Sequence, residues 1–85
     1  MRCAVSSGAG QVLATGQLFI QENEAGHWYL SFRSDRGRVI QGGPITADGD
    51  MTQASQDLFR QFFLTWGVAG VTLTMQVGQQ VSSPY

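Results

Sequence analysis

Hydrophobic and polar residues alternate with a period of two along much of the first half of the chain, the pattern of a β-strand with one buried face. Residues 11–21 (QVLATGQLFIQ) and 27–33 (HWYLSFR) show this alternation, and residues 38–41 (RVIQ) repeat it briefly after the turn sequence SDRG. Gly16 interrupts the first strand and indicates a bulge or a close approach by another backbone. The short connections predict that these three strands form an antiparallel meander.

A helical period of hydrophobic residues follows in the stretch DMTQASQDLFRQFFLTWG. The predicted helix covers residues 51–66. We expect Asp50 to cap its first turn, Gln53 to complete a capping box, and Gly67 or Gly70 to end it. Its core-facing stripe spans an arc of about 120° and contains Met51, Ala54, Leu58, Phe62 and Trp66.

The segment 70–77 (GVTLTMQV) alternates again and predicts a fourth strand. The predicted fold is therefore α+β: a two-layer sandwich in which one helix packs on a four-stranded, mainly antiparallel sheet, in the order β-β-β-α-β. With 85 residues, the chain is expected to form a single domain, 1–85. Residues 1–10 are expected to form an N-terminal arm and residues 79–85 a C-terminal tail.

Several apolar residues exceed what this fold would bury. Phe59 lies at the edge of the helix stripe, Phe63 lies beyond it, and Leu64 lies among polar residues. On the uncovered face of the sheet we expect Leu13, Phe19 and Tyr29. These six residues are the candidate interface, and they predict a homodimer. Two alternatives remain open: the chain's own loop or tail covers the surplus residues, or they line a ligand groove.

Composition narrows the classes of function. The net charge is −1, charged residues make up 13% of the chain, and all five basic residues are arginine. This balance does not favour a nucleic-acid binder, which usually carries a positive surplus. The apolar runs are far shorter than a transmembrane helix, so we expect no membrane partner. No export signal is visible, which predicts a cytoplasmic protein. Cys3 is the single cysteine and excludes an internal disulfide.

The sequence contains no catalytic constellation. His27 is the single histidine and has only Glu22 and Glu24 near it, so we interpret it as a solvated turn residue. Asp48 and Asp50 are explained by a turn and by the helix cap. Neither a nucleophilic triad nor a phosphate-binding loop is present. We therefore predict a protein that is not an enzyme and that has no cofactor and no metal.

The densest charged feature is the hairpin FRSDRGRV, in which Asp35 alone offsets three arginines. Arg33, Arg36 and Arg38 are the candidate contacts for an anion or for nucleic acid. Phe19 and Tyr29 on the adjacent open face would be placed to stack on bases. A hairpin tip that is merely solvated is the alternative.

The stretch GDMTQASQDLF, together with the β-β-β-α-β order, resembles the core of HicB-type antitoxins, whose helix begins near a G-D-T-x-E-E-A pattern. Gly49 and Asp50 match this pattern, whereas the threonine comes one place late and a Gln-Ala pair replaces the two glutamates. The resemblance covers roughly residues 17–77. The hairpin HWYLSFRSDRGRVI also resembles that of small YegP-like domains. The first resemblance implies an antitoxin or a nucleic-acid-associated regulator.

These observations together predict a small, non-catalytic binding or interaction module that acts as a homodimer. The second hypothesis is a HicB-like or nucleic-acid-associated regulator that uses the arginine hairpin. The third is a protein that binds a small anion or metabolite. A second copy or another protein is the expected partner.

Overall fold

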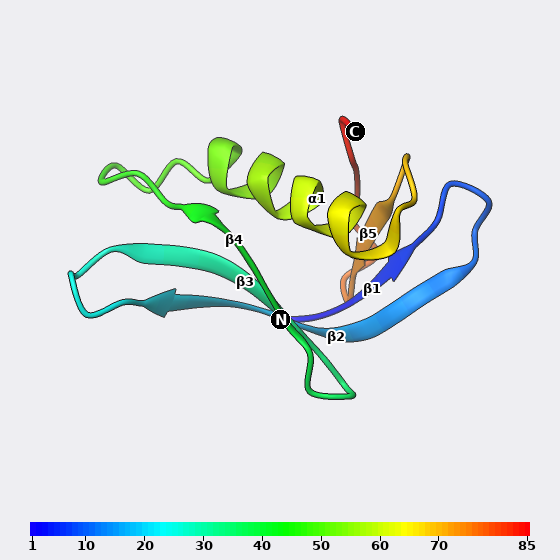
Figure 1. Ribbon diagram of the computed structural model, residues 1–85, viewed down its shortest axis with the longest axis horizontal. Coiled ribbons are helices and arrows are strands. Elements are labelled where there is room, and N and C mark those ends of the chain that lie inside the picture. Colours follow the sequence, from blue (N-terminus) through cyan, green and yellow to red (C-terminus); the bar gives the residue numbers. More distant parts are fainter.

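The strands of the protein form one antiparallel sheet of six strands, in the order β4-β3-β2-β1-β5-β6. The computed structural model describes residues 1–85. Its elements are β1 (Arg2–Ser6), β2 (Val12–Glu22), β3 (Trp28–Ser34), β4 (Val39–Pro44), α1 (Thr52–Trp66), β5 (Thr72–Met75) and β6 (Gln80–Ser82). Figure 1 shows the single helix lying over the sheet.

The predicted class, α+β with one helix, is confirmed, but the predicted four-stranded sheet in the order β-β-β-α-β is wrong. The two missed strands lie in the segments that we expected to be an arm and a tail. β1 is a central strand that pairs with β2 on one side and with β5 on the other, so that Cys3 lies opposite both Gly16 and Met75. β1 was missed because its five residues are too few to show a clear alternation, and its central place depends on the distant strand β5.

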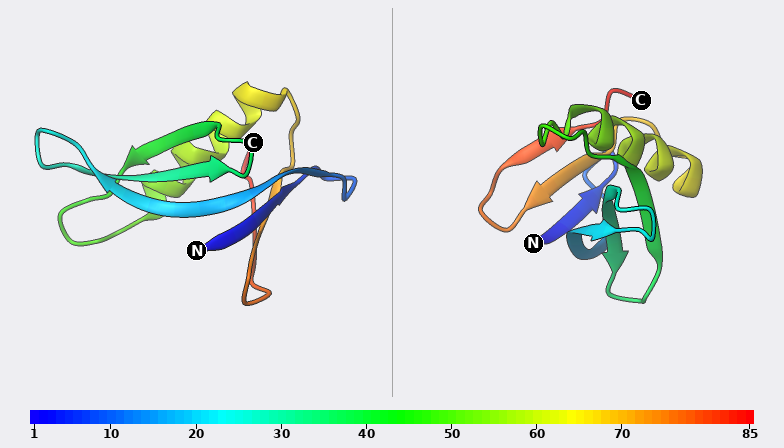
Figure 2. Two further views of the ribbon diagram at one scale, coloured as in Figure 1. Left: turned by 90° about the horizontal axis from the view of Figure 1, so that it is seen from below. Right: turned by 90° about the vertical axis from the view of Figure 1, so that its left-hand side faces the viewer.

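The sheet curls, and α1 lies in the hollow (Figure 2). We call the hollow side the concave face and the outer side the convex face. α1 packs mainly on β4 and β3. The buried apolar core fills the space between α1 and the concave face, and consists of Cys3, Val5, Leu30, Phe32, Ile40, Ala54, Leu58, Phe59, Phe62, Val71 and Leu73.

Phe62 is the centre of this core. Its ring meets the rings of Phe32 and Phe59 edge to face, at centroid distances of 5.6 and 5.9 Å, and lies 5.4 Å from the ring of Trp66. Such aromatic pairs stabilise by about 0.5–1.5 kcal/mol beyond their buried area. The aromatic cluster therefore fixes the helix on the sheet.

Gly16 allows β3 to come close to β2, as the sequence indicated. A β-carbon at this position would overlap the backbone carbonyl of Arg33. The bulge is elsewhere in β2: the register with β1 shifts between Val5 and Ser6, beside Leu13.

The helix boundaries agree closely with the prediction, but the predicted cap is wrong: the N-cap residue is Met51, it has no side-chain cap hydrogen bond, and the capping box does not form. The Asp50 carboxylate accepts a hydrogen bond of 2.8 Å from the Thr52 N–H, while Gln53 donates to the Asp57 carboxylate at 3.0 Å instead of folding back. The helix ends at Gly67, whose left-handed φ of 66° favours glycine. α1 has neither the length nor the apolarity to span a bilayer.

Candidate functional site

The edge strand β4 carries backbone groups that face no other strand. Opposed residues of an antiparallel ladder alternate between hydrogen-bonded and non-bonded pairs. The Ser34 N–H donates to the Arg38 carbonyl at 2.8 Å, so the ladder begins with a bonded pair. Along the register, Ile40 is then the next bonded residue. The N–H and C=O groups of Val39 and Gln41 therefore point away from β3, toward the open edge.

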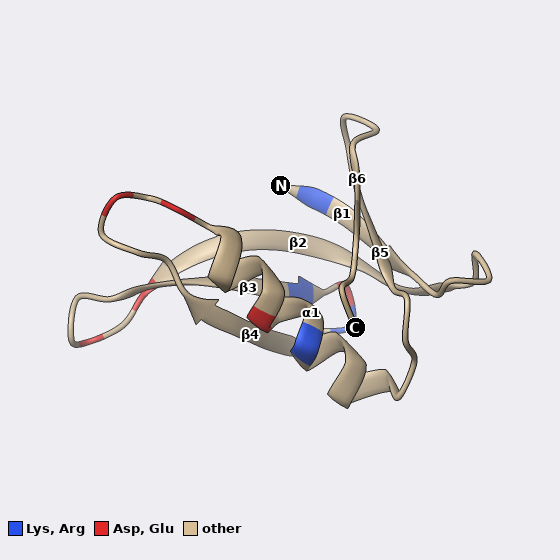
Figure 3. Cartoon of the chain, turned by 90° about the horizontal axis from the view of Figure 1, so that it is seen from above, with Lys and Arg blue, Asp and Glu red and all other residues tan.

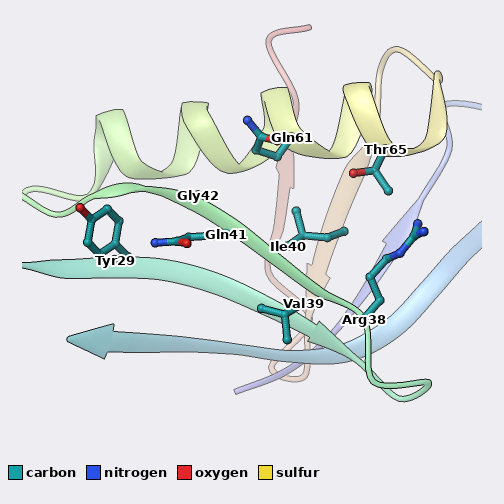
Figure 4. Close-up of a pocket in the computed structure, with 8 residues that line it drawn as sticks. All are labelled: Tyr29, Arg38, Val39, Ile40, Gln41, Gly42, Gln61 and Thr65. Carbon is teal, nitrogen blue, oxygen red and sulfur yellow. The ribbon is translucent and has the colours of Figure 1, made fainter. Parts of the chain in front are cut away.

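A groove of about 610 Å³ runs along this edge, between β4 and α1. Its lining includes Arg38, Val39, Gln41, Gln61 and Thr65 (Figure 4). In Figure 4 Thr65 points from the helix toward β4, the amide of Gln61 lies alongside the helix, and Arg38 points up toward the end of the helix. The outward-facing backbone of β4 is thus exposed in a trough with one wall made by α1.

Two glycines bring α1 directly against β4. A β-carbon on Gly42 would lie 2.8 Å from Cβ of Leu58, and one on Gly43 would overlap the carboxylate of Asp57. These contacts place Asp57 on the flank of α1 that faces β4. Gln61 and Leu64 follow Asp57 at i+4 and i+7, so they lie on the same flank.

The two ends of the edge carry opposite charges. Arg38 stands at one end of the groove, and Asp57 stands over Gly43 at the other. The sole ion pair of the protein joins Arg2 to Asp35, so neither Arg38 nor Asp57 has an ionic partner. The edge of β4 is therefore positive toward its beginning and negative toward its end.

A second cavity, of about 570 Å³, lies beside the hairpin that joins β3 to β4. Arg36, Arg38 and Trp66 line it together with Thr15 and Asp35. We call it the basic pocket. Two guanidinium groups and an indole ring in one cavity provide both charge and a stacking surface for an anionic ligand.

Asp35 does not neutralise the arginines of the basic pocket, because its carboxylate is already engaged. Arg2 donates to both of its oxygens, and the Thr15 hydroxyl donates a further hydrogen bond of 2.6 Å. These donors, Arg2 first, lower the pKa of Asp35 from 3.8 to about 2. The carboxylate is thus held in its charged form by Arg2 and Thr15 and not by the arginines of the pocket.

The three arginines predicted to act together are divided by the sheet. Arg36 and Arg38 share the basic pocket, whereas Arg33 lies on the convex face with its guanidinium carbon 5.9 Å from the centre of the Phe19 ring. Their strand positions explain this. Arg38 lies two residues before Ile40 and so faces the same side of the sheet, whereas Arg33 faces the opposite side from Ile40.

The helix residues predicted for the interface occupy three different environments. Leu64 is 62% exposed and lies on the β4 flank. Phe63 is 39% exposed and lies on the opposite flank, one turn after Phe59. Phe59 is 4% exposed and belongs to the core. Leu64 is therefore the residue of this set that stands beside the open edge.

The three sheet residues predicted for the interface are each half-buried. Leu13 packs against the core, because the neighbouring bulge changes the direction of the strand. Phe19 is covered in part by Arg33, and the Tyr29 hydroxyl accepts a hydrogen bond from Asn23 at 3.3 Å. The convex face therefore presents no continuous apolar patch built on these residues.

Four of the six acidic residues gather at one end of the molecule, away from the arginines (Figure 3). This end is formed by the tip of the β2–β3 hairpin and by the loop before α1, which meet around an apolar cavity lined by Ile20, Trp28 and Ile45. These four are Glu22, Glu24, Asp48 and Asp50. No group of three or more histidine, cysteine or acidic side chains lies close enough together to hold a metal ion.

Comparison with known protein families, with characterised proteins and with solved structures finds no match for this chain.

Proposed function

We propose that the protein is a small, non-catalytic interaction module that binds a partner by adding a strand to the open edge of β4. The observation that carries this proposal is the pair of outward-facing backbone positions, Val39 and Gln41, in a groove beside α1. Strand addition uses such free N–H and C=O groups for affinity, and flanking side chains for specificity.

The first half of β4 lacks the usual protection of an edge strand, and this supports the proposal. Natural edge strands are usually blunted by lysine, by proline or by a bulge. Val39, Ile40 and Gln41 contain none of these, whereas the bulge and the single proline of β4 lie beyond them, at Gly42–Pro44. The other edge strand, β6, has three residues.

The surroundings of the nucleophilic and basic side chains favour binding over catalysis. Cys3 is buried, and burial raises the pKa of its thiol, which lowers its reactivity. The cavity that contains His27 is lined by no carboxylate, serine or cysteine. A free, unpaired thiol also suits a reducing compartment such as the cytoplasm, where we expect the module to act.

A fluorescent peptide with the sequence of residues 38–44, RVIQGGP, tests strand addition. We expect its anisotropy to rise with the wild-type protein. The Gln41→Pro variant should bind it at least about tenfold more weakly, a loss of about 1.4 kcal/mol. Proline at this outward-facing position removes a donor from the edge but none from the β3–β4 ladder.

Gln80→Pro is the matched control, because Gln80 faces outward from the other edge strand. Met75 and Gln79 form a hydrogen-bonded pair, and Thr74 and Gln80 are the next pair along the ladder. By the alternation described for β4, the backbone N–H and C=O groups of Gln80 therefore point away from β5. This variant should bind the peptide as the wild type does. Equal binding to Gln41→Pro and to the wild type, or binding to neither, would overturn the proposal.

A second candidate function, favoured by the basic pocket, is the binding of a phosphate-bearing anion by Arg36 and Arg38 against Trp66. It includes the nucleic-acid-associated or HicB-like regulator suggested by the sequence. Trp66 fluorescence in a Trp28→Phe background reports on it. Quenching by pyrophosphate indicates a small-anion site, and salt-sensitive quenching by a single-stranded oligonucleotide alone indicates a nucleic-acid site. A response to neither, or one that Arg36→Gln leaves unchanged, removes this candidate.

A further inference from the structure

We propose that the partner which adds to β4 is a second copy of the same chain, related by a two-fold axis that passes beside Ile40. The inference rests on the proposed strand addition and names its occupant. Two copies of β4 would run antiparallel across the axis and join the two sheets into one. A two-fold interface requires a surface that is complementary to itself, and the edge of β4 meets this requirement in its backbone, in its charges and in its helix wall.

The backbone fits because the two outward-facing residues lie on either side of Ile40. With the axis beside Ile40, Val39 of one copy lies opposite the partner's Gln41, and the reverse holds at the symmetric position. Each such pair exchanges both of its N–H···O=C bonds. Every free backbone group at Val39 and Gln41 is then satisfied.

The charges fit because Arg38 and Asp57 stand at opposite ends of the same edge. In this register Arg38 lies opposite the partner's Gly42, next to the partner's Gly43. In each copy the Asp57 carboxylate stands over Gly43 and has one oxygen without a hydrogen-bond donor. Arg38 of each copy therefore comes to the carboxylate of the partner's Asp57, and two unpaired charges per copy become two equivalent ion pairs.

The helix wall fits as well, and it accounts for an exposed leucine. The flank of α1 that carries Asp57, Gln61 and Leu64 faces the open edge, so the axis brings the two helices side by side. Leu64, which is 62% exposed in the single chain, would be covered by the partner's helix. Phe63 lies on the other flank and would stay uncovered.

Sedimentation equilibrium over a wide range of concentration is the first test. We expect the wild type to dimerise in the micromolar range and Gln80→Pro to behave alike. Gln41→Pro should raise the dimer dissociation constant at least about tenfold while its circular dichroism stays that of the wild type. A wild type that is monomeric at all concentrations, or a dimer that Gln41→Pro does not weaken, overturns the inference.

A charge exchange tests the register. Arg38→Asp and Asp57→Arg should each weaken the dimer about tenfold, and the double variant should recover most of the loss because the two charges have changed places. Arg36→Asp is the control and should leave the dimer unchanged, because Arg36 lies on the same hairpin but, unlike Arg38, does not line the groove beside β4. If the double variant is as weak as the worse single variant, the Arg38–Asp57 contact is not made.

Leu64→Glu and Phe63→Glu compare the two flanks of α1. We expect the first to weaken the dimer and the second to leave it intact. The opposite result would place the interface on the far flank of the helix and refute the inference.

The outcomes distinguish this inference from the proposed function. If the RVIQGGP peptide binds at β4 while the intact protein stays monomeric, strand addition stands and the second copy is excluded. If the protein dimerises independently of Gln41, this inference fails, and strand addition fails with it only if peptide binding is also independent of Gln41.

Discussion

The carboxylate of Asp57 occupies the space that a β-carbon on Gly43 would fill. Because Gly43 has no side chain, the side chain of Asp57 packs directly against the backbone at the bulged end of β4. It places an unpaired negative charge at the edge of the sheet, a few residues from the unpaired positive charge of Arg38. The same contact thus fixes the packing of the helix and the charge pattern of the candidate site.

The close approach predicts different costs for two adjacent glycines. Gly42→Ala should lower the free energy of unfolding by about 1–3 kcal/mol, because its methyl group would meet the Leu30 carbonyl and Cβ of Leu58, each at 2.8 Å. Gly43→Ala should cost less, since the Asp57 side chain can turn away. Urea unfolding at one protein concentration measures both. Equal stability of Gly42→Ala and the wild type would contradict the contact.

Phe62 should be the most sensitive position of the core. It is fully buried and touches three aromatic rings, so Phe62→Ala should lower the free energy of unfolding by about 3–5 kcal/mol. The neighbouring Phe63→Ala is the control and should change it by no more than about 0.5 kcal/mol. Thermal and urea unfolding compare the two, and similar losses would show that the helix is rotated from the orientation described.

Acid should loosen the contact of β1 with the β3–β4 hairpin. The pKa of Asp35 is lowered from 3.8 to about 2, so its charged form stabilises the folded protein. That stabilisation is complete above pH 3.8 and is lost as the pH falls through about 2. Carboxyl-carbon NMR titration should show the low midpoint, and Arg2→Gln should raise it. A midpoint near 3.8 in the wild type would refute the bidentate contact.

Ser31 should tolerate the loss of its hydroxyl. The side chain is 1% exposed and its oxygen has no hydrogen-bond partner. Burying an unsatisfied polar group costs stability, so Ser31→Ala should raise the free energy of unfolding by about 1 kcal/mol. Differential scanning calorimetry should then record a higher Tm. A lower Tm would mean that the hydroxyl finds a partner in solution.

The local pattern of apolar residues was sufficient to locate elements whose regular structure depends on residues close together in the sequence. The period of the apolar residues located the helix, the alternation located the three strands of the meander, and Gly16 and Gly67 were assigned to positions that require glycine. Strong local signals also predicted the exposure of Leu64, because its place among polar residues follows from the helical period alone.

The candidate site was not predictable in this way. RVIQ reads as a strand, but no feature of those four residues tells whether the strand lies at an edge or in the centre of the sheet. Asp57 and Gln61 read as ordinary solvent-facing helix residues, and their relation to β4 depends on how the helix crosses the sheet. Val39, Gln41, Asp57 and Gln61 were therefore all missed.

The sequence by itself determined one amphipathic helix, its end at Gly67, and a set of half-buried strands, because these depend on local chain geometry and on periods of two and 3.6 residues that neighbours in the chain share. Only the tertiary structure decided that Arg2–Ser6 is the central strand, that β4 is an open edge, and that Arg36 and Arg38 face one pocket while Arg33 faces the other side. The physical reason is that sheet order comes from pairing between distant segments. Local periodicity carries no information about which distant strand provides the partner, or about which strand is left without one.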